Sequence, residues 1–203
     1  FADAGFPHRR VEAWRYTDLS RLVAKTDWHP AVSHDGAVLV PEGRSNPFAG
    51  VASHKLVFVN GFFRQDLSEL DDLPAGVEIL PLEAALERGT KFESAFDANG
   101  PEAMAPIAAL NTACARDGAV IRLGEGIQLE QPVQLIHYTP DGGATVAHTR
   151  NVIELAAGAS MTLLEAQIGW GGAYLVDRVT NLNLGERASL THVRLEDEDI
   201  DNM

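Results

Sequence analysis

The chain has 203 residues, of which 45% are hydrophobic, and its formal net charge at pH 7 is −13. This acidity argues against a nucleic-acid-binding groove, which needs concentrated lysine and arginine. The single cysteine, Cys114, excludes an internal disulfide and any metal or cluster site built only from cysteines of this chain. No apolar run approaches the roughly 18 to 20 residues that span a bilayer, and the first residues lack the pattern of a secretory signal. We therefore expect a cytoplasmic protein that does not act at a membrane.

The first 50 residues predict short helices followed by a loop. In residues 9–24, apolar side chains recur at three- to four-residue spacing, which indicates helix, and Thr17 or Asp18 is suited to cap a second short helix. Residues 29–50 are rich in Pro, Gly, Ser and His, which predicts a loop with one short strand at 37–40.

The next segment predicts a hairpin and two helices. The run 55–59 is β-branched and aromatic, and Asn60-Gly61 separates it from residues 62–64, which is a strong hairpin signal. Residues 81–88 and 106–116 each begin with proline in the first turn and end near glycine, so both are expected to be helical.

Helical spacing gives way to alternation between residues 110 and 120. We therefore divide the chain into a helical, mixed α/β N-terminal region, residues 1–115, and a β region, residues 116–203. The strands expected in the second region lie near 119–123, 127–129, 133–138, 146–155, 159–166, 174–184 and 188–195.

The β region repeats itself. The pattern apolar-x-apolar, three-residue turn, apolar-x-apolar occurs at residues 121–129, 153–161 and 182–190, and the matching residues Leu123, Leu155 and Leu184 are 32 and 29 residues apart. A two-strand unit at a period near 30 residues cannot bury its apolar face alone, so neighbouring units must stack. The expected fold is mainly β, a right-handed parallel β-helix preceded by the mixed α/β region. Because solenoids normally end in caps, we expect 116–203 to be the first part of a longer β-helix.

Catalytic motifs of the common classes are absent, including the P-loop, GxGxxG, HExxH, CxxC and GxSxG, so nucleotide hydrolysis is not expected. Cys114 follows Leu110 and Ile107 by four and seven residues, which places it on the apolar stripe of the expected helix. We interpret it as a buried structural thiol; the alternative is a reactive or cluster-binding thiol.

The seven histidines include no pair spaced i, i+4 on a helix, so no local metal pair forms. The expected strands allow His137 and His148 to face each other, and His192 follows the repeat position Leu190. We interpret all three histidines as surface or hydrogen-bonded residues. No catalytic, cofactor-binding or metal-binding residue is assigned.

Glu154 and Glu165 flank one turn of the repeat, which allows both carboxylates to lie on the same surface. Glycan cleavage uses two carboxylates about 5 to 10 Å apart. Aromatic residues that would stack on sugars are sparse in the β region, so we interpret the two glutamates as solubilising. The alternative interpretation of the repeat is a β-helix carbohydrate-active enzyme or a ligand-binding module.

Four segments resemble one known family in the right order. They are RRVEAWRYTDLSRL at 9–22, LVFVNGFFRQDLS at 56–68, ALNTACARDGAVIRL at 109–123 and HTRNVIELAAGASMTLLE at 148–165. The chain resembles the SufB/SufD family of the Suf iron–sulfur cluster assembly system, and SufD most of all, over essentially all 203 residues. Relatives read LNTAFA where this chain reads LNTACA, an aromatic position that favours a buried Cys114.

The resemblance implies an N-terminal helical region, a central right-handed parallel β-helix and a C-terminal helical region that docks the SufC ATPase. It implies a non-catalytic scaffold subunit that pairs with a SufB-like subunit, with clusters assembled near that interface and no cofactor held by this segment. The family residues implicated in cluster assembly and in SufC binding belong to positions after Met203. A homodimer and a purely structural solenoid are further possibilities.

Overall fold

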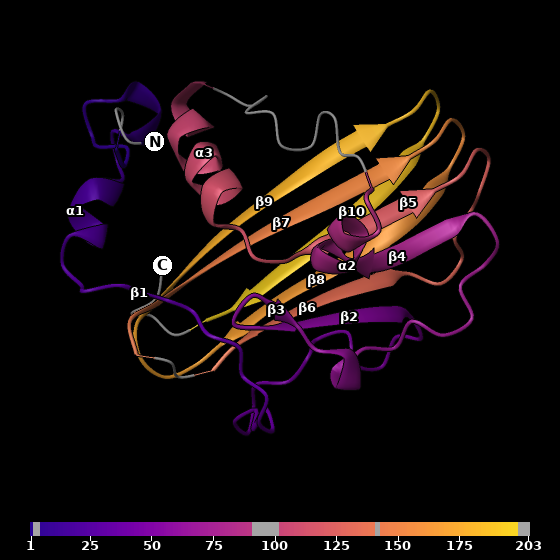
Figure 1. The fold of residues 1–203 in the computed structure, drawn as a ribbon, viewed down its shortest axis with the longest axis horizontal. Helices are drawn as coiled ribbons and strands as arrows, with labels where there is room; N and C mark the ends of the chain where they lie inside the picture. The colour runs from indigo at the N-terminus through magenta and orange to yellow at the C-terminus, as the bar shows by residue number, and fades with distance from the viewer. Residues whose placement is uncertain (2–4, 91–101, 141–142, 199–203) are drawn as a thin grey trace.

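The computed structural model describes residues 1, 5–90, 102–140 and 143–198. The protein is mainly β, and two five-stranded sheets face each other with short helices on the outer surfaces (Figure 1). The first sheet contains β1 (His29–Pro30), β4 (Val77–Pro81), β5 (Ala119–Leu123), β7 (Thr145–Leu155) and β9 (Tyr174–Leu184). The second contains β2 (His54–Val59), β3 (Phe62–Phe63), β6 (Val133–Thr139), β8 (Ser160–Gly169) and β10 (Ser189–Asp197). The α-helices are α1 (Leu19–Val23), α2 (Leu82–Glu87) and α3 (Ala105–Cys114), and 3-10 turns occur at Glu12–Trp14, Gln65–Leu67 and Glu102–Met104.

From β5 onward, successive strands alternate between the two sheets. Within each sheet, the neighbouring strands of this part of the chain are parallel. β5, β7 and β9 are neighbours in the first sheet, and β6, β8 and β10 are neighbours in the second. Leu123 pairs with Leu155, and Leu155 pairs with Leu184, so the three leucines of the sequence repeat lie in one row. The predicted in-register stacking of the repeat is confirmed at these positions.

The three-residue turns of the repeat also stack on one another. Their last residues, Gly126, Gly158 and Arg187, all have positive φ, the conformation that reverses the chain in so short a turn. Backbone N–H groups of Gly126 and Gly158 donate to the next turn, each at 2.9 Å. The turns therefore continue the hydrogen bonding of the strands.

Most elements expected before residue 115 are present. Helices α2 and α3 and the β2–β3 hairpin are confirmed, and the hairpin turns at Asn60 and Gly61 with φ of 53° and 84°. The expected helix over 9–24 is instead a 3-10 turn and α1, separated where the Asp18 carboxylate accepts a hydrogen bond from Arg21 N at 3.1 Å. Asp18 is thus the predicted cap.

Two strand predictions are wrong. Residues 37–40 form no strand, because no neighbouring strand pairs with them and their Leu39 side chain is 80% exposed. Residues 127–129 make only an isolated bridge, between Gln128 and Ser160. In both places the local sequence pattern predicted a strand, but no neighbouring strand pairs with the segment over its whole length.

The main core lies between the sheets and is built from alternate residues of their strands, such as Leu56, Leu135, Ile153 and Leu163. The outer faces are covered separately. Helix α2 packs on the first sheet, and a segment that includes Phe48 packs on the second. Strands β2 and β4 belong to residues 1–115 but pair with β6 and β5, so both segments contribute to both sheets. The boundary near residue 115 stays a prediction.

Asp117 and Gly118 join three parts of the fold immediately before β5. The Asp117 carboxylate is buried and accepts hydrogen bonds from the backbone N–H groups of Phe63, Glu83 and Gly118, at 3.1, 3.2 and 2.8 Å. Burial raises the pKa of this carboxyl group, and the three hydrogen bonds oppose that rise. At Gly118, a Cβ would lie 1.9 Å from the carbonyl oxygen of Arg150 in β7.

We expect Gly118→Ala to lower the free energy of unfolding by about 3 kcal/mol, because the added methyl meets backbone that must shift rather than a flexible side chain. Urea unfolding measures the change. The control is Gly50→Ala, where nothing lies within 4 Å of the added Cβ, and it should change stability by less than about 0.5 kcal/mol. Equal effects of the two substitutions would contradict the close approach of the two backbones.

Candidate functional site

A cluster of polar and charged side chains occupies one end of the space between the sheets. Along β8, Met161 and Leu163 lie in the apolar core. Because side chains alternate along a strand, Glu165 and Gln167 lie on the same face as those residues. Arg178 of β9 meets them from the other sheet. We call Glu165, Gln167, Arg178 and His192 the inter-sheet ionic cluster.

Hydrogen bonds connect every member of this cluster. Arg178 Nη1 donates to Glu165 Oε1 at 2.8 Å, and Arg178 Nη2 donates to Gln167 Oε1. His192 Nε2 of β10 lies 2.8 Å from Glu165 Oε2. The side chains of Arg178 and Glu165 are 3% and 2% exposed, whereas that of His192 is 31% exposed. Burial lowers the pKa of Arg178, and the Glu165 carboxylate opposes that shift.

His137 of β6 lies beside this cluster, in the same buried space. Its ring stacks on Phe58, with the ring centroids 5.1 Å apart, and its Nε2 has no hydrogen-bond partner among the described residues. Burial is the main cause that lowers the pKa of His137 well below its usual value, and the positive charges of Arg178 and Arg194 add to it. The imidazole is therefore neutral in the folded protein near pH 7.

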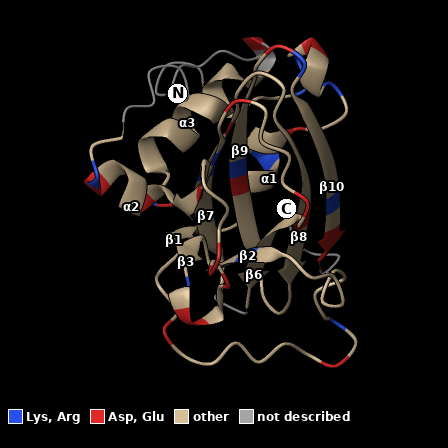
Figure 2. Ribbon diagram, turned by 90° about the vertical axis from the view of Figure 1, so that its right-hand side faces the viewer, with Lys and Arg blue, Asp and Glu red and all other residues tan. Residues whose placement is uncertain are grey.

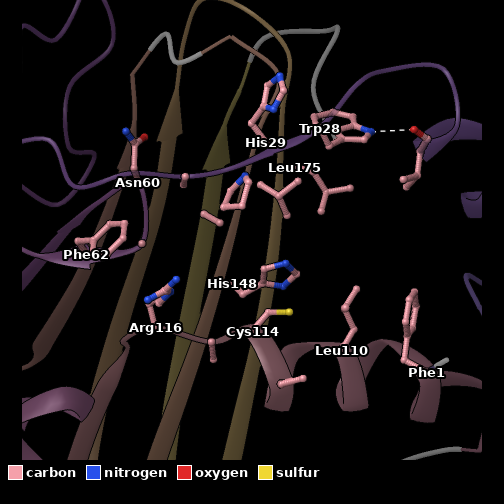
Figure 3. A pocket seen from close by; sticks show the side chains of 18 of the residues that line it. Phe1, Trp28, His29, Asn60, Phe62, Leu110, Cys114, Arg116, His148 and Leu175 are labelled. Carbon is pink, nitrogen blue, oxygen red and sulfur yellow. Dashed lines mark hydrogen bonds between the residues drawn. The ribbon is translucent and has the colours of Figure 1, made fainter.

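A second candidate site is a cavity of about 660 Å³ beside α3, which we call the α3 cavity (Figure 3). It lies between the N-terminal segment, the β2–β3 turn, the end of α3 and the outer face of β7 and β9. Its lining is mostly apolar and aromatic. The polar groups that line it belong to His29, Asn60, Cys114, Arg116 and His148.

Cys114 is exposed and lines the α3 cavity, so the prediction of a buried structural thiol is wrong. The face of α3 that contacts the sheet is marked by Asn111, which is fully buried. Asn111 Nδ2 donates to the carbonyl oxygens of Thr149 and Asp177, both at 3.0 Å. Cys114 is the last residue of the helix, three residues later, and is not covered by the contact between the helix and the sheet.

His148 lies on the outer face of β7, where its Nδ1 is 2.9 Å from Asp177 Oδ2 of β9. Because a carboxylate only accepts hydrogen bonds, Nδ1 carries the proton and Nε2 remains for another partner. The idea that His148 faces His137 is wrong, since β6 and β7 belong to different sheets.

The two carboxylates considered for glycan cleavage do not share a surface. Glu154 pairs with Arg122 of the neighbouring strand at 2.7 Å, on the outer side of the first sheet. Glu165 is buried between the sheets in the ionic cluster. This separation removes the acid pair that a glycosidase mechanism would need.

Within the described parts of the chain, no group of three or more His, Cys, Asp or Glu residues is placed to hold a metal ion. The helices of those parts are all too short or too polar to cross a bilayer. Sequence reasoning missed Arg178 and Asp177. The sequence did contain a signal for Arg178. It lies four and six residues before Leu182 and Leu184 in β9, and residues an even number of positions apart share one face of a strand.

Comparison with known proteins gives two matches. Residues 1–135 match the family model described as the SufBD protein N-terminal region. The chain is also 28% identical over 201 residues to an iron–sulfur cluster assembly SufBD family protein of Synechocystis sp.. That alignment covers 93% of this chain and 43% of the relative, so the chain spans less than half the length of the curated relative it matches.

We expect Arg178→Met to lower the free energy of unfolding by about 3–5 kcal/mol, because it leaves the Glu165 carboxylate buried without its cation. Adding Glu165→Leu in the same chain should restore most of the loss. The matched control is Arg187→Met, which breaks an ion pair with Glu186 whose side chains are 80% and 79% exposed and should cost less than about 1 kcal/mol. Urea unfolding at pH 7 separates the three variants. An Arg178→Met protein as stable as the control would show that the pair is not buried.

The lowered pKa of His137 predicts that acid weakens the fold. In the unfolded chain this histidine takes up a proton below about pH 6.5, whereas the folded protein resists it. Its contribution is therefore complete above that pH and is lost as the pH falls, by at most about 1.4 kcal/mol per pH unit. In His137→Phe, which keeps an aromatic ring beside Phe58, the stability lost between pH 7 and pH 5 should be smaller.

Urea unfolding at several pH values measures this difference. His29→Phe, which removes an exposed histidine, serves as the control and should keep the wild-type loss between the two pH values. If His137→Phe loses as much stability on acidification as the wild type, the buried histidine is not its source.

Proposed function

Because the chain belongs to the SufBD family, we propose that it is a non-catalytic scaffold subunit of an iron–sulfur cluster assembly complex. In this proposal it pairs with a SufB-like subunit and a SufC-like ATPase in the cytoplasm. The cluster is the cargo of the complex rather than a resident cofactor of this chain. The SufC-like ATPase contacts the part of the full-length polypeptide that follows the segment described above.

The observation that carries the proposal is the open edge formed by β9 and β10. In the described part of the chain, β9 pairs only with β7 and β10 pairs only with β8, so each strand has one unpaired edge. Leu182 and Leu184 of β9 are 50% and 45% exposed, although their two rows continue buried isoleucines and buried leucines of β5 and β7, respectively. Unpaired strand edges with apolar side chains favour pairing with further strands.

We propose that the two sheets form the first coils of a right-handed parallel β-helix, and that further coils cover this edge. In Figure 2, β10 lies at the right-hand edge of the molecule, where a basic residue is followed by acidic residues toward the end of the strand. Each half-exposed leucine gains about 1 kcal/mol when it is buried. A completed solenoid then offers its far end to a SufB-like subunit, and a second copy of the chain is the alternative partner.

The sequence contains no Walker motif, which supports a complex in which this chain is the scaffold and another subunit binds ATP. ATP hydrolysis is then the task of the SufC-like partner. The buried charges of the ionic cluster also pair with one another, which agrees better with a structural role than with catalysis.

Affinity purification of the tagged full-length polypeptide, expressed together with a SufB-like protein and a SufC-like ATPase, tests the proposal. We expect both partners to be recovered, and ATP hydrolysis by the complex to disappear when the Walker lysine of the ATPase is changed. The control is the same tag on an unrelated protein.

Recovery of the polypeptide alone or only as a homodimer, under conditions in which both partners are folded, would contradict the scaffold proposal. Hydrolysis of a polysaccharide by the purified polypeptide would favour the carbohydrate-active alternative instead.

A further inference from the structure

We propose that the α3 cavity binds a small amphipathic anion, an aromatic or aliphatic molecule that carries one acidic group and one hydrogen-bond donor. This inference goes beyond the scaffold function and does not depend on it. Three observations support it, namely the size and lining of the cavity, the sign of its charges, and a buried acceptor without a donor.

The cavity has the size and lining of a small-molecule site. Its volume of about 660 Å³ falls within the range of roughly 300–1,000 Å³ that is usual for such sites. Trp28, Phe62, Leu110 and Leu175 are among the side chains that provide its apolar walls. In Figure 3, His29 and Trp28 lie on one side of the cavity, and Cys114 and His148 lie on the other. An apolar ligand body would be enclosed from both sides.

The charges around the cavity favour an anion. Arg116 contributes a positive charge to the lining, which also includes His29 and His148, and none of the described lining residues is acidic. This arrangement contrasts with the net charge of −13 for the chain. Among the described residues, no carboxylate forms an ion pair with Arg116, so its planar guanidinium is available to pair with a carboxylate, sulfonate or phosphate.

The side-chain oxygen of Asn60 is the reason why the ligand should carry a hydrogen-bond donor. Its side chain is 7% exposed and lines the cavity, and its Oδ1 has no hydrogen-bond partner among the described residues. The positive φ of Asn60 explains why asparagine suits this turn, but it does not explain an unsatisfied oxygen. A buried acceptor without a donor is unfavourable, and a ligand hydroxyl or N–H would satisfy it.

His148 adds a second polar contact with a fixed orientation. Asp177 holds its Nδ1 at 2.9 Å, which fixes the tautomer and leaves Nε2 as the nitrogen for a ligand. Both side chains of this pair are mostly buried, at 13% and 9% exposure. The imidazole is therefore already oriented before a ligand binds, which reduces the entropy lost on binding.

The test uses two fluorescent probes with the same skeleton. The anion 8-anilinonaphthalene-1-sulfonate has an apolar body, an acidic group and an N–H donor, and N-phenyl-1-naphthylamine lacks only the sulfonate. We expect the full-length polypeptide to bind the anion at one saturable site, about tenfold more tightly than the neutral probe. Equal affinity for the two probes would overturn the assignment of an anion site.

Variants outside the apolar core locate the site. Arg116→Gln should weaken binding of the anion about tenfold and leave the neutral probe unchanged, whereas Arg187→Gln, in a turn of the repeat, should change neither. Asn60→Gly keeps the turn conformation and should weaken both probes about threefold. Ala113→Trp fills the cavity mouth and should abolish binding at this site. The open edge of β9 and β10 is intact in all four variants.

Cys114 reports occupancy independently of fluorescence, because it is exposed and lines the same cavity. Saturating anilinonaphthalene sulfonate should slow its alkylation by iodoacetamide, measured by mass spectrometry of the peptide that contains it, and Ala113→Trp should remove this dependence on the probe. If the anion binds Arg116→Gln and Ala113→Trp as it binds the wild type, or leaves the alkylation rate unchanged, the α3 cavity is not its site and the proposal fails.

Discussion

In-register parallel pairing between neighbouring strands of each sheet is the constraint on which the rest of the structure depends. When Leu123, Leu155 and Leu184 occupy one row, every other position of these strands is placed in a row as well. A shift by one residue would exchange the buried and outer faces of a whole strand. The register also sets the positions of the turns, which hydrogen-bond to one another at the same edge of the sheets. Apolar packing and turn geometry therefore support a single alignment.

The same register explains why charges are buried. Glu165 follows the apolar inner positions of β8, and Arg178 precedes those of β9, so the two side chains meet between the sheets. Removing both charges from water is costly, and their mutual attraction is helped to offset this cost by hydrogen bonds from Arg178 to Gln167 and between His192 and Glu165, although Arg178 Nε has no partner among the described residues. Buried ion pairs contribute little net stability in general, but a misaligned strand would leave each charge unpaired. The cluster thus penalises alternative registers more than it stabilises the native one.

Features determined by local sequence were predictable. The Asn60-Gly61 turn, the cap at Asp18 and the period of the leucines depend on neighbouring residues or on simple repetition, and all three are present. Features determined by contacts with distant parts of the chain were not predictable. The apolar spacing around Cys114 indicated a buried face, but Asn111 makes the helix–sheet contact through hydrogen bonds to two carbonyl groups. Spacing alone also does not tell which sheet a strand joins, and that decides the surroundings of each histidine and glutamate considered above.

Strand β9 connects the two surfaces to which function is assigned. One of its edges pairs with β7 and the other is open, while Asp177 on the same strand orients His148 in the α3 cavity. The carbonyl group of Asp177 also accepts the hydrogen bond from Asn111 that anchors α3. Strands at the edge of a sheet move more than strands paired on both sides, because fewer hydrogen bonds hold them. A strand that pairs with the open edge of β9 would therefore steady Asp177, and with it both the imidazole and the helix that shape the cavity.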